Sequence, residues 1–153
     1  MSLRKDLSAG PIVVLVLLII FVFVLYVIIP AIRSNINLRF GDGIFKAHVT
    51  TNINDISKIT KLNDNQAYLV SFPNDNIWSI EARNVKTPVD VVWLNSEKKL
   101  IFAWTNISPD EYSTKVYSPD SEARYILIFP ADTVKNKSLN KGKEAIFEIN
   151  EGI

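Results

Sequence analysis

Residues 84–101 read NVKTPVDVVWLNSEKKLI and contain most of an expected β-hairpin. A mostly apolar segment, VDVVWLN at 89–95, is followed by Ser-Glu-Lys at 96–98 and then by KLIFAWTNI at 99–107. Two short runs rich in β-branched and aromatic residues, separated by three polar residues, predict antiparallel strands joined by a tight turn.

A single carboxylate, Asp90, interrupts the first apolar arm of this hairpin, two residues after Pro88. Burying a carboxylate without partners is costly, so Asp90 either points toward solvent or is held by hydrogen bonds. Pro88 restricts φ and lacks an N–H donor, which suits the first residues of a strand. We expect Asp90 to tie the strand to the preceding turn at residues 84–87, with a ligand-facing role as the alternative.

Strand signals recur on both sides of the hairpin with short connections between them. Residues 53–62 carry Ile53, Ile56, Ile59 and Leu62 at a spacing of three, which predicts a short amphipathic helix or a series of turns. Asp132-Thr133 is expected to cap a brief helix at about 133–138. The other expected strands are residues 44–51, 67–72, 77–85, 123–129 and 145–149.

These elements predict a mainly β (β-rich α+β) domain of about 110 residues. We expect an antiparallel, partly closed barrel-like sheet with one or two short helices.

Residues 12–29 (IVVLVLLIIFVFVLYVII) form a run of eighteen apolar residues without charge, glycine or proline. A helix of this length spans about 27 Å, close to the hydrocarbon thickness of a bilayer. A cleaved signal peptide normally has an apolar core of only about 7–15 residues and a small-residue cleavage site. The sequence IPAIRSN that follows is a poor match to such a site. The pattern therefore favours an uncleaved transmembrane signal anchor over residues 12–32.

The orientation of the anchor follows from flanking charge. Arg4, Lys5 and the terminal amine precede the apolar run, and Arg33 and Arg39 follow it, so the positive charges are nearly balanced. A short basic N-terminus before a single helix usually stays inside, which predicts a cytoplasmic N-terminus and a C-terminal domain outside the cytoplasm. The expected segments are a tail at 1–11, the anchor at 12–32, a stalk at 33–43 and the β-rich domain at 44–150.

Composition excludes several classes of partner and cofactor. Two of the seventeen Lys and Arg residues and one of the sixteen Asp and Glu residues precede residue 33, which leaves fifteen of each in the domain. A neutral domain argues against general affinity for nucleic acid or anionic lipid. The chain has no cysteine and a single histidine, His48. We therefore expect no disulfide, no metal site and no cofactor.

Six aromatic residues occur in the same half of the expected domain. Aromatic side chains near polar groups can form a platform for a sugar or a peptide. Packing in the core of a β-domain explains most of them equally well, and we favour core packing. The six residues are Trp78, Trp93, Trp104, Tyr112, Tyr117 and Tyr125.

The segments AYLVSFP, RNVKTPVDVVWLNSEKKLI, YSPDSEARYILIFPADT and LNKGKEAIFEI follow one another between residues 67 and 149. This order resembles the domain-of-unknown-function 192 family. The family pattern has G-M-L-F-x-F, W-M-K-N-T-x-x-P-L-D-x-x-F, Y-x-S-x-x-P-A-x-Y-V-L-E and a closing G-x-x-x-G-D-x-V. Asn84, Pro88 and Asp90 fall at the spacing of the second block.

The chain also departs from the family pattern. Glu81 and Ala82 stand where the family has Trp and Met, Arg83 replaces a Lys, and Lys143 replaces an acidic residue. The resemblance implies a small β-rich fold that is often secreted or membrane-attached in bacteria and archaea. It implies no established reaction.

These observations favour a membrane-anchored extracytoplasmic domain that binds, without catalysis, a small polar ligand, an envelope glycan or a protein partner. The expected ligand-binding residues surround the hairpin start. In this hypothesis Asn84 and Asp90 form hydrogen bonds and Arg83 a charge-assisted one, with Lys86 and Thr87 beside them.

Two alternatives stay open. An envelope hydrolase would use Asp90 or Glu81 as an acid or base, because the two carboxylates lie on neighbouring segments. A structural subunit of a membrane complex would instead pack both its helix and its domain on partners. The bulky, glycine-free helix lacks the small-residue seam that tight helix pairing uses, which disfavours the last reading.

Overall fold

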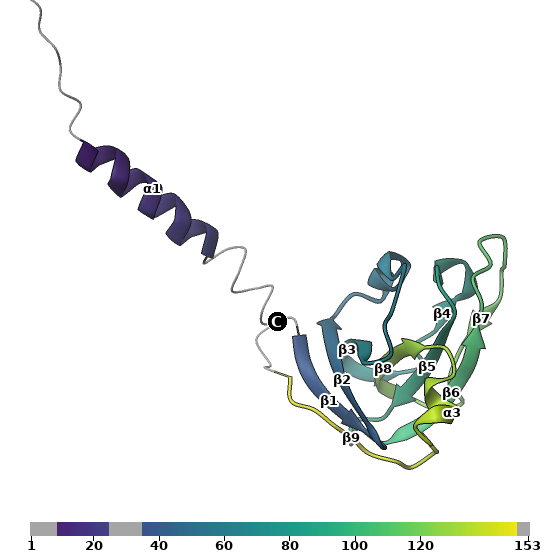
Figure 1. Cartoon of the computed structure of the whole chain (residues 1–153). Helices are drawn as coiled ribbons and strands as arrows, with labels where there is room; N and C mark the ends of the chain where they lie inside the picture. Colours follow the sequence, from purple (N-terminus) through teal and green to yellow (C-terminus); the bar gives the residue numbers. More distant parts are fainter. Residues whose placement is uncertain (1–8, 25–34, 150–153) are drawn as a thin grey trace, which may run out of the picture. The chain divides into compact units, whose positions relative to one another are not determined.

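The computed structural model describes residues 9–24 and 35–149 (Figure 1). The chain divides into two compact units, Met1–Ser34 and Asn35–Ile153.

Within its described residues, 9–24, the first unit contains one helix, α1, at Ala9–Phe23. The large apolar side chains at residues 12–23 are all exposed, with exposed fractions from 43% to 62%. Within the part of the chain that the structure describes, no helix has the length and apolarity needed to span a bilayer. Residues 25–32, the remainder of the predicted anchor, lie outside the described residues.

The second unit is built on a seven-stranded sheet in the order β6-β5-β8-β3-β2-β1-β9. A two-stranded sheet pairs β4 with β7. Three short helices complete the described part of the domain: η2 at Ile53–Lys58, η3 at Ala82–Asn84 and α3 at Thr133–Asn136. The strands are β1 Asn35–Phe40, β2 Gly43–Thr50, β3 Gln66–Asn76, β4 Ile80–Glu81, β5 Val89–Leu94, β6 Leu100–Ile107, β7 Val116–Tyr117, β8 Ala123–Pro130 and β9 Ala145–Ile146.

The large sheet curls until its two edge strands meet at one end. An isolated bridge pairs Lys99, before β6, with Glu144, before β9. The Leu100 N–H also donates to the Lys143 carbonyl oxygen at 2.9 Å. The mainly β, partly closed architecture predicted from the sequence is therefore confirmed.

The pairing of β2 with β3 differs from the antiparallel expectation. These two strands run parallel, whereas the other paired strands of the described sheets are antiparallel. The physical reason is the connection at residues 51–65, which contains η2 and is long enough to return the chain to the same end of the sheet. The expected hairpin is confirmed, since β5 pairs with β6.

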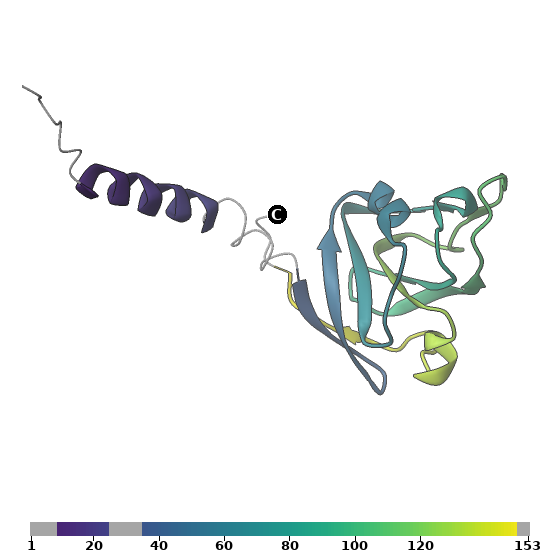
Figure 2. The ribbon, with the colours of Figure 1, turned by 45° about the horizontal axis from the view of Figure 1, so that its top comes forward.

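The prediction of a stalk at residues 33–43 is wrong where the structure describes it. Strand β1 pairs along its whole length with β2, and Figure 2 shows the two strands side by side. Leu38 and Phe40 are fully buried, while Asn37 and Arg39 alternate with them at exposed positions. This period of two is a strand signal, and the left-handed Gly41 (φ +59°) provides the turn into β2.

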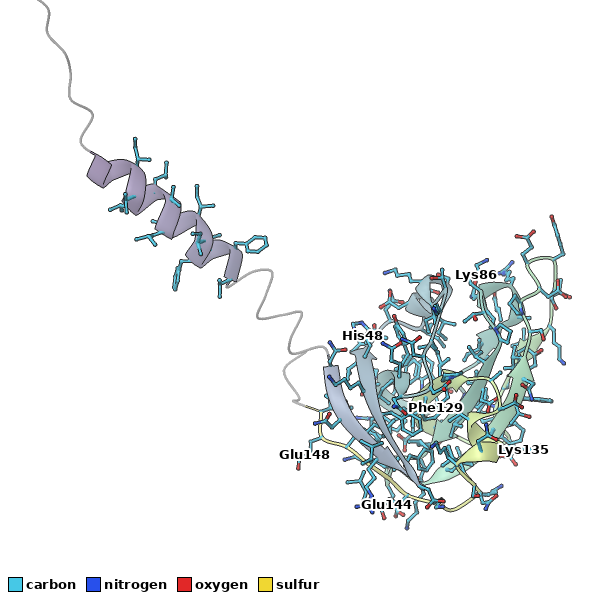
Figure 3. All side chains as sticks on the ribbon, in the orientation of Figure 1. His48, Lys86, Phe129, Lys135, Glu144 and Glu148 are labelled. Atoms are coloured by element: carbon cyan, nitrogen blue, oxygen red, sulfur yellow. The ribbon has the colours of Figure 1, made fainter. Side chains whose placement is uncertain are left out.

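Two clusters of buried apolar side chains lie on opposite faces of the central strands. On β8, Leu127 and Phe129 belong to one cluster, and Ile126 and Ile128 belong to the other. Both faces of β8 are thus covered, which explains its continuous apolar sequence. Burial of each large side chain such as Phe129, labelled in Figure 3, contributes about 1.5–3 kcal/mol.

Candidate functional site

Asp90 is fully buried on β5, and backbone groups occupy both of its carboxylate oxygens. Oδ1 accepts a hydrogen bond from the Asn106 N–H at 2.9 Å, near the end of β6. Oδ2 accepts one from the Val134 N–H at 2.8 Å, in the first turn of α3. One carboxylate therefore joins three segments that are separate in sequence.

The expectation that partners hold Asp90 is confirmed, but the predicted partner is wrong. The donors lie 16 and 44 residues away rather than in the turn at residues 84–87. Strand β5 lies between β6 and β8, and Asp90 is opposite Phe129 near the end of β8. This register brings the carboxylate to the place where β6 ends and α3 begins.

The predicted helix after Asp132 is confirmed, but its capping chemistry differs from the prediction. Asp132 occupies the N-cap position in the left-handed region (φ 67°) and makes no capping hydrogen bond with its side chain. Asp90 accepts the hydrogen bond from the first turn instead. The Asp132 carboxylate accepts a hydrogen bond from the Asn106 side-chain amide at 3.1 Å.

A pocket of about 360 Å³, which we term the Asp90 pocket, opens beside these three residues. Asn106 (φ 55°), Asp132 (φ 67°) and Ser138 (φ 50°) all line it in the left-handed conformation. The fourth described non-glycine residue with positive φ, Lys98, lies in the turn between β5 and β6. Left-handed backbone in non-glycine residues costs free energy and tends to gather at ligand sites, so its concentration here marks a candidate site.

The Asp90 pocket presents both donors and acceptors. Its polar lining combines one solvent-exposed carboxylate, two amides, two hydroxyls and one ammonium group. An apolar patch lies beside them. The lining residues are Asp90, Thr105, Asn106, Asp132, Val134, Lys135, Ser138, Leu139 and Asn140.

The other expected ligand-binding residues do not join Asp90. Arg83, on η3, forms an exposed ion pair with Glu81, and the two line a separate, smaller pocket of about 160 Å³. The Lys86 ammonium donates to the Arg83 carbonyl oxygen at 3.1 Å. Asn84 and Thr87 are half-buried and line neither pocket. The structure thus separates the predicted site into two places.

Sequence reasoning missed Asn106, Asp132, Lys135 and Ser138 as site residues. Asn and Asp tolerate the left-handed region better than other non-glycine residues, which is the only local signal that two of them carry. That signal does not indicate that the end of β6 and the segment after β8 meet. Among the described residues, no group of three His, Cys, Asp or Glu side chains could hold a metal ion.

The aromatic residues divide between core and surface. Trp93 is fully buried, and its Nε1–H donates to the Trp78 carbonyl oxygen at 2.7 Å. Trp104 is 38% exposed, and the Lys115 ammonium lies 5.4 Å from its ring centroid. Tyr112 is 89% exposed. Core packing is confirmed for Trp93, and the Lys115 ammonium lies over one face of the exposed Trp104 ring.

Two solved structures share this fold. A crystal structure from Sinorhizobium meliloti 1021, of a protein described as a candidate transcription regulator, matches with a TM-score of 0.64 and 15% identity, covering 74% of this chain and 92% of that one. A protein of unknown function from Novosphingobium aromaticivorans DSM 12444 matches with a TM-score of 0.63 and 13% identity, covering 73% and 83%. At these identities the likeness shows the fold alone.

No curated protein matches the chain. Residues 56–147 match the family DUF192, described as "Uncharacterized ACR". The match spans more than half of the chain and includes β5, β6 and α3, which together build the Asp90 pocket. The chain therefore belongs to the DUF192 family.

Proposed function

We propose that this protein is a membrane-anchored, non-catalytic binding domain that holds a sugar unit of an envelope glycan in the Asp90 pocket, outside the cytoplasm. One observation carries the proposal. Three polar residues in the left-handed conformation converge on a single pocket whose wall is fixed by a buried carboxylate. A rigid wall lowers the entropy that binding would otherwise cost.

The lining of the pocket supports a sugar as the ligand. Sugar hydroxyls act as donors and acceptors at once, and the Asp132 carboxylate, the Asn140 amide and the Ser138 hydroxyl supply the matching groups. The half-buried Val134 offers apolar surface for the C–H face of a ring.

The state of Asp90 favours binding over hydrolysis. A general base must reach the proton that it abstracts, and both Asp90 oxygens already accept backbone hydrogen bonds. Glu81 lines a different pocket and is paired with Arg83. The envelope-hydrolase alternative therefore gains no acid–base pair from this arrangement.

Ser138→Gly tests the sugar site without disturbing the fold. Glycine adopts φ 50° freely, so the variant should keep or raise the free energy of unfolding by up to about 1 kcal/mol. Loss of the hydroxyl should weaken tri-N-acetylglucosamine binding about fivefold, a cost of about 1 kcal/mol. The measurement is a titration of the full-length protein, followed by amide NMR shifts, in a polyoxyethylene detergent that contains no sugar.

Lys98→Gly is the matched control, because Lys98 has the same left-handed backbone (φ 61°) but lies outside the pocket. Its titration curve should equal that of the unmodified protein. Equal affinity of Ser138→Gly and the unmodified chain, or shifts that avoid the residues of the Asp90 pocket, would overturn the sugar proposal.

The anchor at residues 12–32 rests on a second set of observations. The run at residues 12–29 is apolar throughout, and the large side chains of α1 are exposed around the whole helix. A helix that is apolar on all sides needs an apolar environment, which a bilayer provides. The apolar run does not set the orientation, which follows from the flanking charge: with Arg4, Lys5 and the terminal amine before the run, we propose that the domain at residues 44–150, with β1 before it, lies on the outer side of the membrane.

Single-cysteine labelling tests this topology, since the chain has no cysteine of its own. A membrane-impermeant maleimide should label Thr114→Cys, in an exposed loop of the domain, on intact spheroplasts. Ser2→Cys should react only after lysis. Reaction in the reverse order would place the domain on the cytoplasmic side.

A second experiment tests the anchor itself. The double variant Leu17→Arg/Ile20→Arg should move the protein from the carbonate-washed membrane pellet to the supernatant.

A further inference from the structure

A second pocket, of about 590 Å³, lies on strands β1, β2 and β3, and we term it the His48 pocket. It shares no lining residue with the Asp90 pocket. Figure 3 labels His48 on one side of the domain and Lys135, of the Asp90 pocket, on the other. The side chains of His48 and Lys46 alternate with the buried Phe45 and Ala47, so they lie on the opposite face of β2.

The floor of the His48 pocket is a set of cross-strand neighbours. Asn37 on β1, Lys46 on β2 and Gln66 on β3 are opposite one another in register. Two residues along, His48 is opposite Tyr68. Directly opposed side chains on one face lie close together, so the sheet itself groups an ammonium, two amides, an imidazole and a phenol.

The pocket carries positive charge without a matching acid. Lys46 and Lys61 line it, and no Asp or Glu does. Within the described residues, neither lysine forms an ion pair. One nearby carboxylate, Asp55, is already engaged, because hydrogen bonds from Lys58 and then Thr50 hold its pKa below its ordinary value. Two ammonium groups are thus left for an external anion.

One wall of the pocket is apolar and aromatic. The His48 and Tyr68 rings meet edge to face with their centroids 5.1 Å apart. Leu62, in the segment that leads into β3, adds aliphatic surface, and Gln66 fixes this segment by accepting a hydrogen bond from the Asn63 N–H at 3.1 Å. An anion alone would leave this wall uncovered.

We propose that the His48 pocket binds an organic phosphate, with the phosphate on Lys46 and Lys61 and the organic group against Tyr68 and Leu62. A phosphate monoester carries close to two negative charges, matching two ammonium groups, and its oxygens accept from amide donors. Strands β1 and β2 lie outside the family match at residues 56–147, so half of the residues that line this pocket fall outside the matched range. The site is independent of the proposed sugar site.

Phenyl phosphate is the probe, titrated into the full-length protein in the same polyoxyethylene detergent. Lys46→Gln/Lys61→Gln should weaken its binding about tenfold, because each charge-assisted bond is replaced by a neutral one. Tyr68→Leu should weaken phenyl phosphate binding but leave inorganic phosphate binding unchanged. Benzyl alcohol, which has the ring without the charge, should not bind detectably.

The matched control is Lys86→Gln/Lys141→Gln, which removes the same charge from two exposed lysines outside the pocket. It should leave the affinity unchanged. Equal weakening by both double variants would reduce the effect to net charge and overturn the site, as would absence of binding by both phenyl phosphate and phosphatidic acid. Phosphatidic acid added to the micelles distinguishes a lipid headgroup from a soluble phosphate ester. If phosphatidic acid shifts the amide NMR signals of the pocket and phenyl phosphate does not, the bound phosphate belongs to a lipid headgroup. Tri-N-acetylglucosamine binding should survive every variant of this pocket.

Discussion

Asp90→Ala should lower the free energy of unfolding by about 2–5 kcal/mol, because it leaves two backbone N–H donors without their acceptor. The donors belong to Asn106 and Val134, and Asp90 itself is fully buried. Urea unfolding of the full-length protein, followed by tryptophan fluorescence in non-ionic detergent, measures the loss.

Asp90→Asn is the sharper variant. Asparagine has nearly the same shape but only one acceptor oxygen, so its NH₂ group would face one of the two N–H donors. We expect a loss close to that of Asp90→Ala. Asp132→Asn makes the same chemical change at an exposed carboxylate of the same pocket and should cost under about 1 kcal/mol. If Asp90→Asn has the same urea midpoint of unfolding as the unmodified protein, the two hydrogen bonds of Asp90 do not stabilise the fold.

Trp93→Ala should cost about 3–5 kcal/mol, because it empties the largest fully buried side-chain position in the described domain. Trp93→Phe keeps most of the volume but removes the Nε1–H bond to the Trp78 carbonyl oxygen. That variant should cost about 1–3 kcal/mol. Circular dichroism during urea unfolding suits both variants, since fluorescence changes with the number of tryptophans.

Trp104→Ala is the control for Trp93. Trp104 is on the neighbouring strand β6 but is 38% exposed. Its ring lies edge to face with Phe102 and Tyr117, at centroid distances of 5.8 and 5.4 Å. The cost of its removal should stay below half of that for Trp93→Ala. Equal losses in the free energy of unfolding for Trp93→Ala and Trp104→Ala would mean that burial does not determine how much each tryptophan stabilises the domain.

These variants also distinguish the structural role of Asp90 from ligand binding in the Asp90 pocket. Asp90→Asn should lose tri-N-acetylglucosamine binding together with folding, since it loosens the wall of the pocket. Ser138→Gly should lose affinity alone. A single variant at Asp90 therefore could not distinguish a structural role from a binding role, whereas the pair can.

Most of the β-strands could be predicted from local sequence. The hairpin at 89–107, the strand at 123–129 and the short helix after Asp132 depend on patterns within a few residues, and all three are confirmed. Residues 35–40 have the same alternation, so the segment expected to be a stalk is strand β1, paired with β2. In this segment the alternation of buried and exposed side chains, and not the position after the apolar run, indicates the structure.

The candidate site could be predicted only in part. The sequence indicated that Asp90 needs partners, and Asp90 does line a pocket. It did not indicate that Arg83 and Glu81 would pair with each other at another pocket. Which polar side chains share a pocket depends on strand order, and strand order is set by contacts between distant segments.

By itself, the sequence determined the apolar segment at residues 12–29, the strand-rich domain after it and the family signature around Asp90. The tertiary structure alone decided that the end of β6 and the start of α3 meet over that carboxylate, with donors 16 and 44 residues away. It also decided that β1, β2 and β3 align two rows of polar side chains into the His48 pocket. The reason is physical: a strand's period sets which face a side chain takes, but only sheet register sets what lies beside it.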